Sequence, residues 1–271
     1  MYKIICYLGI LSFMLAACQD KKSGNSYQER ESIGKNSALS QDVFLPEENN
    51  YELFWEDNFE GETLDTSKWR MRGIGARRIG FNDPSMIKVE NGNLLLMYDI
   101  KADSILAGAV GTGETFLTTY GYFECRAELQ KGIGPWAAFW MQSPFISKGE
   151  DPGKFGTEID IFEYFKELGE NHLTHCLHWA YGPNQKTSGR MDSDLDNLSK
   201  GFHTFALEWT PEKYVFYIDG LKFHEQKQGL SHVDEYMILS MEIPSKLEGI
   251  KNACAPDTFK VDYVKVYKKK E

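Results

Sequence analysis

From Tyr51 onward the sequence consists of short runs rich in β-branched and aromatic residues, separated by turn signals. Such runs, bounded by Gly, Pro, Asn and Asp, are typical of β-strands. Hardly any stretch has the amphipathic period of a helix of useful length. The runs are NGNLLLMYDI, YGYFECRAELQ, WAAFWMQ, TEIDIFEYF, HLTHCLHWAY, HTFALEWT, KYVFYIDGLKFHE, YMILSMEI and FKVDYVKVY. The chain is therefore predicted to be all-β.

Two local patterns indicate how these strands are arranged. Asp219-Gly220 lies between two alternating runs, which is the sequence signature of a tight hairpin. In the last run, alternation would place Val261 and Tyr263 on one face and Val264 on the other. Because both faces are partly apolar, we expect a β-sandwich of two packed antiparallel sheets.

The run GTEIDIFEYF holds three carboxylates, Glu158, Asp160 and Glu163, among apolar residues. Residues two apart share a face of a strand, so Glu158 and Asp160 should point together and Glu163 away. A β-bulge within 161–162 would add one residue and return Glu163 to the same face. Unpaired buried charges are costly, so three acids on one face must line a wet cleft or bind a cation.

Two glutamates around a central aspartate suit double displacement at a sugar. One carboxylate attacks the anomeric carbon, while the other carboxyl group protonates the leaving oxygen and later activates water. Coupling through Asp160 would push neighbouring pKa values apart, so that one acid stays protonated while another stays charged. The alternative is a solvated acidic strand or a cation site, although Ca²⁺ usually takes its oxygen ligands from a loop.

The beginning of the chain indicates export. Lys3 precedes an apolar stretch that is short for a membrane span and ends in Leu-Ala-Ala-Cys at Cys18. Residues 1–17 are therefore predicted to be a signal peptide that is removed. The ending resembles a bacterial lipoprotein signal, in which Cys18 becomes lipidated and anchors the protein to the outer membrane or cell surface. The alternatives are an uncleaved anchor or an ordinary secretory signal with an incidental cysteine.

The segment after Cys18 is polar, with few apolar residues before residue 49. Such a stretch buries too little surface to offset its ordering entropy. We therefore predict a flexible tether over 18–49 and one domain over 50–271. A net charge of −10 without a basic block argues against nucleic-acid binding, and we expect a monomer.

Three cysteines remain within the predicted domain, Cys125, Cys176 and Cys254. They allow at most one disulfide inside the chain, and the sequence does not choose the pair. No Cys-x-x-Cys spacing or His-rich stretch indicates a zinc site.

The acidic run, with YGYFECRAELQKGIGPWAAFWM before it and FHTFALEWTPEKYVFYIDG after it, resembles glycoside hydrolase family 16. This family of jelly-roll enzymes includes laminarinases, agarases and carrageenases. FWEDNFEGETLDTSKW and VDYVKVY fit the same pattern, so the resemblance covers about residues 51 to 267. It implies a jelly roll with a concave substrate cleft, retention of anomeric configuration and cleavage inside a polysaccharide. By position, Glu158 matches the nucleophile, Asp160 the assisting acid and Glu163 the acid/base.

The resemblance also implies residues that bind substrate. Trp136, Trp140 and Trp179 lie on segments that match cleft-lining strands, where aromatic faces stack on sugar rings. Core packing is the alternative for Trp140 and Trp179, because only one face of each strand meets the cleft. His178 matches a position near the cleaved bond, with a purely structural histidine as its alternative, and the same holds for His175.

No cofactor is expected for catalysis, but a structural calcium site is a further implication. Asp262 and Gly92 occupy the positions that match a calcium ion on the convex face of relatives. The alternative for Asp262 is a surface salt bridge, given the nearby Lys265.

The departures from the family pattern concern the substrate. Arg77 and Arg78 stand in GIGARRIGFNDPSMIKVENGNL, and Glu242 stands in MILSMEIPS, where many relatives have a Gly-rich apolar strand. Guanidinium groups match sulfate or carboxylate oxygens, so Arg77 is a candidate for binding an anionic sugar, with a solvated loop as the alternative. A β-1,3-glucan or a β-galactan is the expected substrate. A glycan-binding lipoprotein without catalysis and a transglycosylase are the competing functions.

Overall fold

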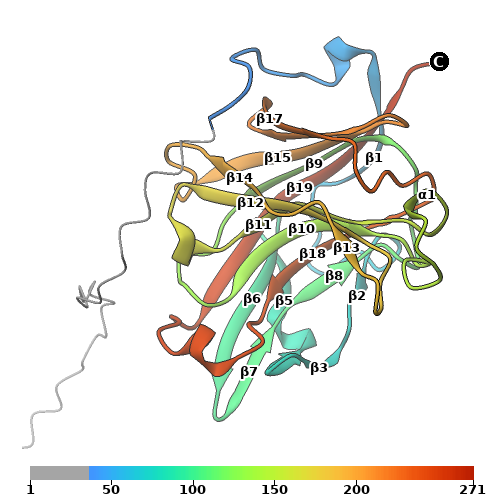
Figure 1. The fold of residues 1–271 in the computed structure, drawn as a ribbon. Helices are drawn as coiled ribbons and strands as arrows, with labels where there is room; N and C mark the ends of the chain where they lie inside the picture. Colours follow the sequence, from blue (N-terminus) through green and yellow to red (C-terminus); the bar gives the residue numbers. More distant parts are fainter. Residues whose placement is uncertain (1–36) are drawn as a thin grey trace, which may run out of the picture. The chain divides into compact units, whose positions relative to one another are not determined.

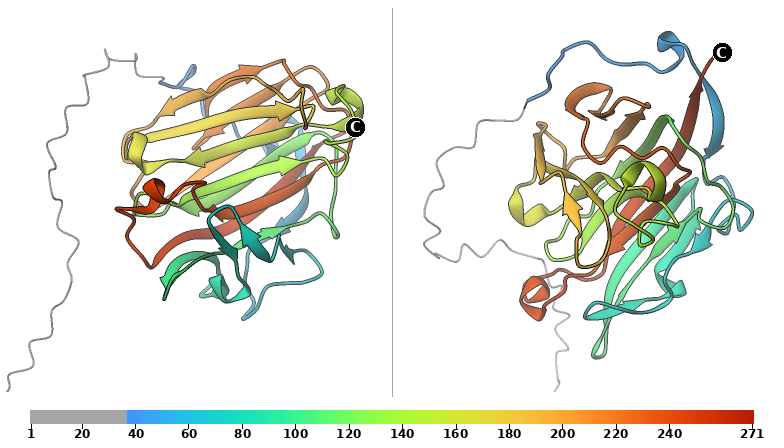
Figure 2. Two further views of the ribbon diagram at one scale, coloured as in Figure 1. Left: turned by 60° about the horizontal axis from the view of Figure 1, so that its bottom comes forward. Right: turned by 45° about the vertical axis from the view of Figure 1, so that its right-hand side comes forward.

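The computed structural model describes residues 37–271, which form two β-sheets packed face to face (Figures 1 and 2). The predicted signal peptide and Cys18 lie outside the described residues. Within 37–271, helical structure is limited to α1 (Pro152–Phe155) and four short 3-10 helices, Glu47–Asn49, Pro84–Met86, Lys166–Leu168 and Leu247–Ile250. None of these helices has the length and apolarity to cross a bilayer.

The first sheet is built around β19, the long C-terminal strand that is red in Figure 1. Next to it lie β9 on one side and β6 on the other, while β1 pairs with β19 and β5 with β6. The order is β17 (Leu221–Gln226), β16 (Tyr214–Ile218), β15 (Phe202–Trp209), β9 (Gly121–Glu128), β19 (Asp257–Lys269), β6 (Asn93–Lys101), β7 (Ser104–Ala107), β4 (Gly80–Asn82) and β3 (Gly75–Arg77), with β1 (Tyr51–Asp57) and β5 (Ile87–Glu90) off this path.

The second sheet has β11 and β10 at its centre, as the left view of Figure 2 shows. The order is β13 (Lys186–Thr187), β12 (His172–Trp179), β11 (Glu158–Tyr164), β10 (Trp136–Gln142), β18 (Tyr236–Glu242), β8 (Ala109–Gly111) and β2 (Arg70–Met71), with β14 (Met191–Asp194) paired to β12. The strand pairs of the described chain are antiparallel except β4 with β7, which is parallel. The predicted sandwich of two sheets is therefore confirmed.

All nine predicted runs form strands, and the predicted hairpin joins β16 to β17. Ile218 lies opposite Leu221, and Asp219 and Gly220 both have positive φ, 51° and 72°. These are the dihedrals that a two-residue type I′ turn requires, and Asp-Gly adopts them readily. The strands that the sequence did not indicate are mostly two to four residues long, too short to show a period.

The main core lies between the two sheets. Phe162 of the second sheet meets Phe205 of the first with ring centroids 4.3 Å apart. Strand β10 alternates: Ala137, Phe139 and Met141 face this core, whereas a separate cluster of Trp136, Ala138 and Trp140 packs with Ile238 on the opposite face. This alternation gives the second sheet an outer face of its own.

The alternation predicted for the last strand is wrong. Val261, Val264 and Val266 all contribute to the main core, although strict alternation separates Val261 from the other two. The pairing of β19 with β9 shifts register between Val261 and Tyr263, which leaves Asp262 as an extra residue. A bulge of one residue exchanges the faces of everything that follows it.

The predicted tether is also wrong for its described part. The backbone N–H of Phe44 donates to Gly220 O at 2.8 Å, and the Phe44 ring stacks on Tyr122 with centroids 5.1 Å apart. Tyr51 and Tyr217 complete this aromatic cluster. Burial of the Phe44 ring thus holds an otherwise polar segment against the domain. The packed domain therefore begins before residue 50.

Candidate active site

A β-bulge in β11 brings the three carboxylates together. Phe162 pairs with Phe139 and Asp160 pairs with Trp140, so Ile161 has no partner on β10. The pairing of β11 with β12 shifts register over the same residues. The bulge predicted within 161–162 is therefore confirmed.

The bulge turns Ile161 and Phe162 both into the main core. Glu158, Asp160 and Glu163 then line one cavity of about 440 Å³ on the outer face of the second sheet. The other residues that line it are Arg72, Arg77, Arg78, Ala138, Trp140, Gln142, His178, Tyr181 and Glu242.

The surroundings of Glu163 raise its pKa. Trp136 Nε1 donates to Glu163 Oε1 at 2.9 Å. Burial raises the pKa of Glu163 above its ordinary value, the Trp136 hydrogen bond opposes that rise, and the Glu158 charge adds to it. Since burial outweighs the hydrogen bond, the protonated carboxyl group is favoured.

Glu158 is surrounded by donors instead. Gln142 Nε2 donates to Glu158 Oε2 at 2.9 Å, and the Tyr181 hydroxyl donates to the same oxygen. Tyr236 in turn donates to Gln142 Oε1 at 2.9 Å, which fixes the orientation of the amide. This oxygen therefore accepts hydrogen bonds from two donors.

Sequence reasoning missed this support around Glu158. Gln142 could have been found, because it continues the outward positions 136, 138 and 140 of its strand. Tyr181 and Tyr236 carry no such signal, because a tyrosine in a strand or loop is common.

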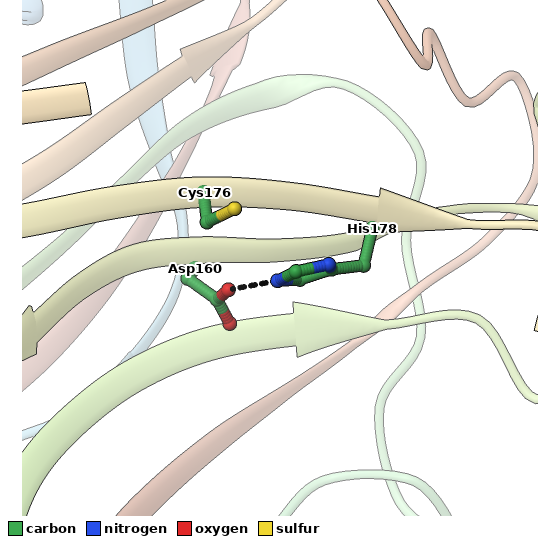
Figure 3. A group of neighbouring side chains, drawn as sticks. All are labelled: Asp160, Cys176 and His178. Atoms are coloured by element: carbon green, nitrogen blue, oxygen red, sulfur yellow. Dashed lines mark ion pairs between the residues drawn. The ribbon is translucent and has the colours of Figure 1, made fainter. Parts of the chain in front are cut away.

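Asp160 lies between the two glutamates and faces His178 (Figure 3). Its Oδ2 atom is 3.6 Å from His178 Nε2. Burial, followed by the charges of Glu163 and Glu158, raises the pKa of Asp160 well above its ordinary value. A hydrogen bond with Cys176 is the largest cause that raises the pKa of His178. The imidazole of His178 thus lies beside a row of acids in which burial and mutual repulsion favour protonation of Asp160.

The paired arginines line the cavity, so the solvated-loop alternative is wrong. Arg77 Nη2 lies 2.8 Å and Arg78 Nη1 lies 3.4 Å from Glu242 Oε2. Glu242, at the end of β18, is buried and neutralises part of their charge. In the left view of Figure 2 the teal segment that carries these arginines crosses in front of the second sheet.

Trp136 and Trp140 are less exposed than expected for residues that stack on sugar rings. Arg78 lies over the Trp136 ring at 4.7 Å and Arg72 over the Trp140 ring at 4.5 Å. Both rings are more than nine-tenths buried. The predicted open stacking face on Trp136 is therefore wrong, because a guanidinium group covers it. Trp140 does line the cavity, with its Nε1 donating to Ser240 Oγ at 3.0 Å.

Trp179 does not lie in the cavity, although His178 beside it does. Alternation along β12 turns Trp179 toward the main core, where it packs as a partly buried side chain. An added Cβ at Gly229 would lie 2.7 Å from the Trp179 ring, so the loop covers the indole closely. Trp179 is thus a packing residue and not a sugar platform.

The residues expected to bind calcium do not form a cation site as placed. Asp262 forms an ion pair with Arg126, so a guanidinium group occupies its carboxylate. Gly92 lies in the turn between β5 and β6. The calcium site stays a prediction.

Two of the three domain cysteines are buried free thiols. Cys125 lies in the main core, whereas Cys176 lies beside Asp160 and His178. Burial opposes ionisation of Cys176, but hydrogen bonds with His178 and Thr187 outweigh it and lower the pKa of the thiol.

A sandwich whose outer sheet face carries one glutamate with a raised pKa and a second that accepts hydrogen bonds from two donors, both lining one cavity, has the architecture of a glycosidase. Residues 81–265 match the model of Glycosyl hydrolases family 16, and the chain belongs to that family. Membership of that family indicates a glycosidase, the class of enzyme that hydrolyses O-glycosyl bonds.

Two curated relatives and one solved structure illustrate the family. Glucan endo-1,3-beta-glucosidase A1 of Niallia circulans is 26% identical over 80% of this chain. Keratan-sulfate endo-1,4-beta-galactosidase of Sphingobacterium multivorum is 28% identical, also over 80% of this chain. The matches span 38% and 55% of the lengths of these two relatives. The laminarinase from Flavobacterium sp. UMI-01 is similar over 80% of this chain and all of its own, with 26% identity and a TM-score of 0.68.

Proposed function

We propose that the protein is a retaining, endo-acting β-glycanase in which Glu158 is the nucleophile and Glu163 the acid/base. The observation that carries this proposal is the bulge at Ile161, which lines up the two glutamates in one cavity with opposite surroundings. Burial favours the protonated form of Glu163, and Glu158 accepts from Gln142 and Tyr181.

The mechanism follows from this division. Glu158 attacks the anomeric carbon as Glu163 gives its proton to the leaving oxygen, which forms a glycosyl ester on Glu158. The deprotonated Glu163 then takes a proton from water, which attacks the same carbon and releases Glu158. Burial and the charges of Glu163 and Glu158 favour the protonated form of Asp160, which limits the repulsion in the row.

For the substrate we favour a β-galactan with anionic substituents over a neutral β-1,3-glucan. The two relatives act on different chains, one named for a glucan and the other for keratan sulfate. Arg72 lines the cavity over Trp140 and has no carboxylate partner within 37–271. A guanidinium group in such a place suits sulfate or carboxylate oxygens, whereas the covered indoles leave little surface for stacking neutral rings.

The experiment is an incubation with laminarin, mixed-linkage glucan, agarose, carrageenans, keratan sulfate and mucin O-glycans. Product masses identify the linkage cut, and NMR of the first product reports its anomeric configuration. Glu158→Gln should abolish cleavage, whereas Glu212→Gln, on an exposed loop, should cut at the normal rate. Retained activity in Glu158→Gln, or an inverted product, would contradict the mechanism.

The same panel separates the competing functions. Transfer to another glycan would give chains longer than the substrate and would indicate a transglycosylase. Retardation in a glycan gel without any cleavage would indicate a binding lipoprotein. Loss of the preference for anionic galactan in Arg72→Met would support the substrate class, and an unchanged preference would contradict it.

We further propose export as a lipoprotein anchored through Cys18. This rests on the sequence of the first 18 residues alone. Cys18→Ala should prevent incorporation of labelled fatty acid and release the protein from membranes, and continued labelling of that variant would contradict the anchor.

A further inference from the structure

Three side chains with different metal-binding atoms converge beside the carboxylates. Cys176 and His178 are two residues apart on β12 and therefore share a face. Asp160 is the cross-strand partner of Cys176 on β11. The thiol, imidazole and carboxylate atoms all lie within 4.8 Å of one another, and Figure 3 shows them pointing into the same space.

The ligand types select the metal. A thiolate, an imidazole nitrogen and a carboxylate oxygen are each common ligands of Zn²⁺, which takes four ligands in a tetrahedron. Ca²⁺ and Mg²⁺ prefer oxygen ligands throughout, so the sulfur atom disfavours both. Asp160 and His178 line the open cavity, which leaves a fourth position accessible to water.

The surroundings of Cys176 leave its sulfur able to bind. Its contact with His178 would become part of the site, and its other polar contacts include Thr187 Oγ1 at 3.2 Å and Gly189 O at 3.6 Å, both weak hydrogen bonds. Asp160 Oδ2 and His178 Nε2 already lie 3.6 Å apart, a separation close to that of two ligands on one zinc ion. Small side-chain rotations would therefore complete the site without moving either strand.

We propose that Asp160, Cys176 and His178 form a Zn²⁺ site in the cleft, and that the bound ion inhibits catalysis. Binding forms a Zn–S bond as the Cys176 thiol loses its proton to solvent, without any change of oxidation state. The ion would bind Asp160, which lies between Glu158 and Glu163, and His178 beside it, and its inhibitory effect rests on the proposed function. The binding itself does not depend on that function.

The binding test uses Co²⁺ as a spectroscopic probe for Zn²⁺ on the purified full chain. A Co²⁺–thiolate bond gives an intense charge-transfer band in the near ultraviolet, which added Zn²⁺ should remove. Cys176→Ser should abolish the band, and His178→Gln should keep it with an affinity weaker by roughly tenfold or more. Cys254→Ser removes another thiol of the domain and should leave the band in place.

The inhibition test compares each variant with its own rate in the presence of a chelator. Zn²⁺ should reduce the rate of the unmodified chain, and Cys176→Ser should need a Zn²⁺ concentration higher by roughly 100-fold for the same reduction. A band that survives Cys176→Ser would overturn the site. A thiolate band in a protein that cuts no glycan would support the site while the proposed function fails.

Discussion

At the scale of single residues, the two glutamates differ because of what touches each carboxylate. Glu163 is partly buried and meets one indole N–H, whereas Glu158 receives an amide and a phenol on the same oxygen. Burial destabilises the charged form of a carboxylate and donors stabilise it. The division of labour thus depends on a few neighbours, and changing one should shift the pH dependence in a known direction.

Trp136→Phe should move the alkaline limb of kcat to higher pH. The indole N–H stabilises the charged form of Glu163, so its removal raises the pKa of this acid further. Because the proposed mechanism needs protonated Glu163, activity should persist to a pH higher by roughly one unit. Trp140→Phe is the matched control, since its N–H donates to Ser240 Oγ, and its alkaline limb should stay in place. A shift toward lower pH in Trp136→Phe would contradict the role of Glu163.

At the scale of the element, the bulge in β11 is held from behind by β12. His175 Nδ1 donates to Ile161 O at 2.5 Å, and its Nε2 accepts from Ser193 Oγ at 2.9 Å. Burial lowers the pKa of His175 to about 3, so the ring is neutral at physiological pH. A neutral histidine with one donor and one acceptor therefore satisfies the carbonyl of the extra residue.

His175→Phe should reduce kcat by about tenfold or more with a smaller change in KM, since the bulge aligns Glu163 with Glu158. The free energy of unfolding should fall by about 1 to 3 kcal/mol, because the Ile161 carbonyl loses its donor. His175→Asn keeps a donor near Nδ1 and should restore much of kcat. His224 contacts Ser193 Oγ but not Ile161. His224→Phe therefore tests whether loss of the hydrogen bonds around Ser193 lowers kcat without loss of the contact to the bulge. An equal kcat loss in His224→Phe would argue against a specific role for the bulge contact.

The segment before β1 is a second element whose role the fold decides. Phe44 packs among Tyr51, Tyr122 and Tyr217, against the hairpin at Gly220. Phe44→Ala should lower the free energy of unfolding by about 1 to 3 kcal/mol, as for a partly buried aromatic residue. Val43→Ala is a control at an exposed neighbour. If denaturant unfolding showed the same free energy of unfolding for both variants, the segment would be a flexible tether, as the sequence predicted.

At the scale of the whole molecule, one buried acid should make stability depend on pH. Glu235 is fully buried next to β18, and its Oε1 accepts from the Thr157 N–H at 2.8 Å, at the start of β11. Burial raises its pKa to about 8 from 4.5. The folded protein therefore keeps this proton at pH values where the unfolded chain has lost it.

The stabilising contribution of Glu235 is complete below its unfolded pKa of 4.5 and is lost as pH rises through about 8. Between these values the free energy of unfolding should fall by about 1.4 kcal/mol per pH unit from this group. Glu235→Gln stays neutral, so the difference between the two proteins should shrink with falling pH. Denaturant unfolding at several pH values measures this, and parallel curves would show that Glu235 does not titrate in this range.

The class of fold, the hairpin turn, the family and the bulge that unites the acids could all be predicted from the sequence. These features are local: alternation, an Asp-Gly pair and the six-residue spacing of Glu158 to Glu163 can be read within one strand or turn. Hydrogen bonding between strands allows few backbone arrangements, so a local sequence pattern is enough to predict the local structure.

Tertiary structure alone decided which side chains are accessible and what holds each acid. Glu242, 165 residues away in the sequence, forms an ion pair with Arg77. Arg78 covers the indole of Trp136, which was expected to stack on a sugar ring. The bulge at Asp262 and the packing of Phe44 likewise depend on distant partners. Contacts between segments far apart in the sequence do not change the residue periodicity within either segment. Such contacts depend on which two segments the fold brings together, so they cannot be predicted from one strand alone.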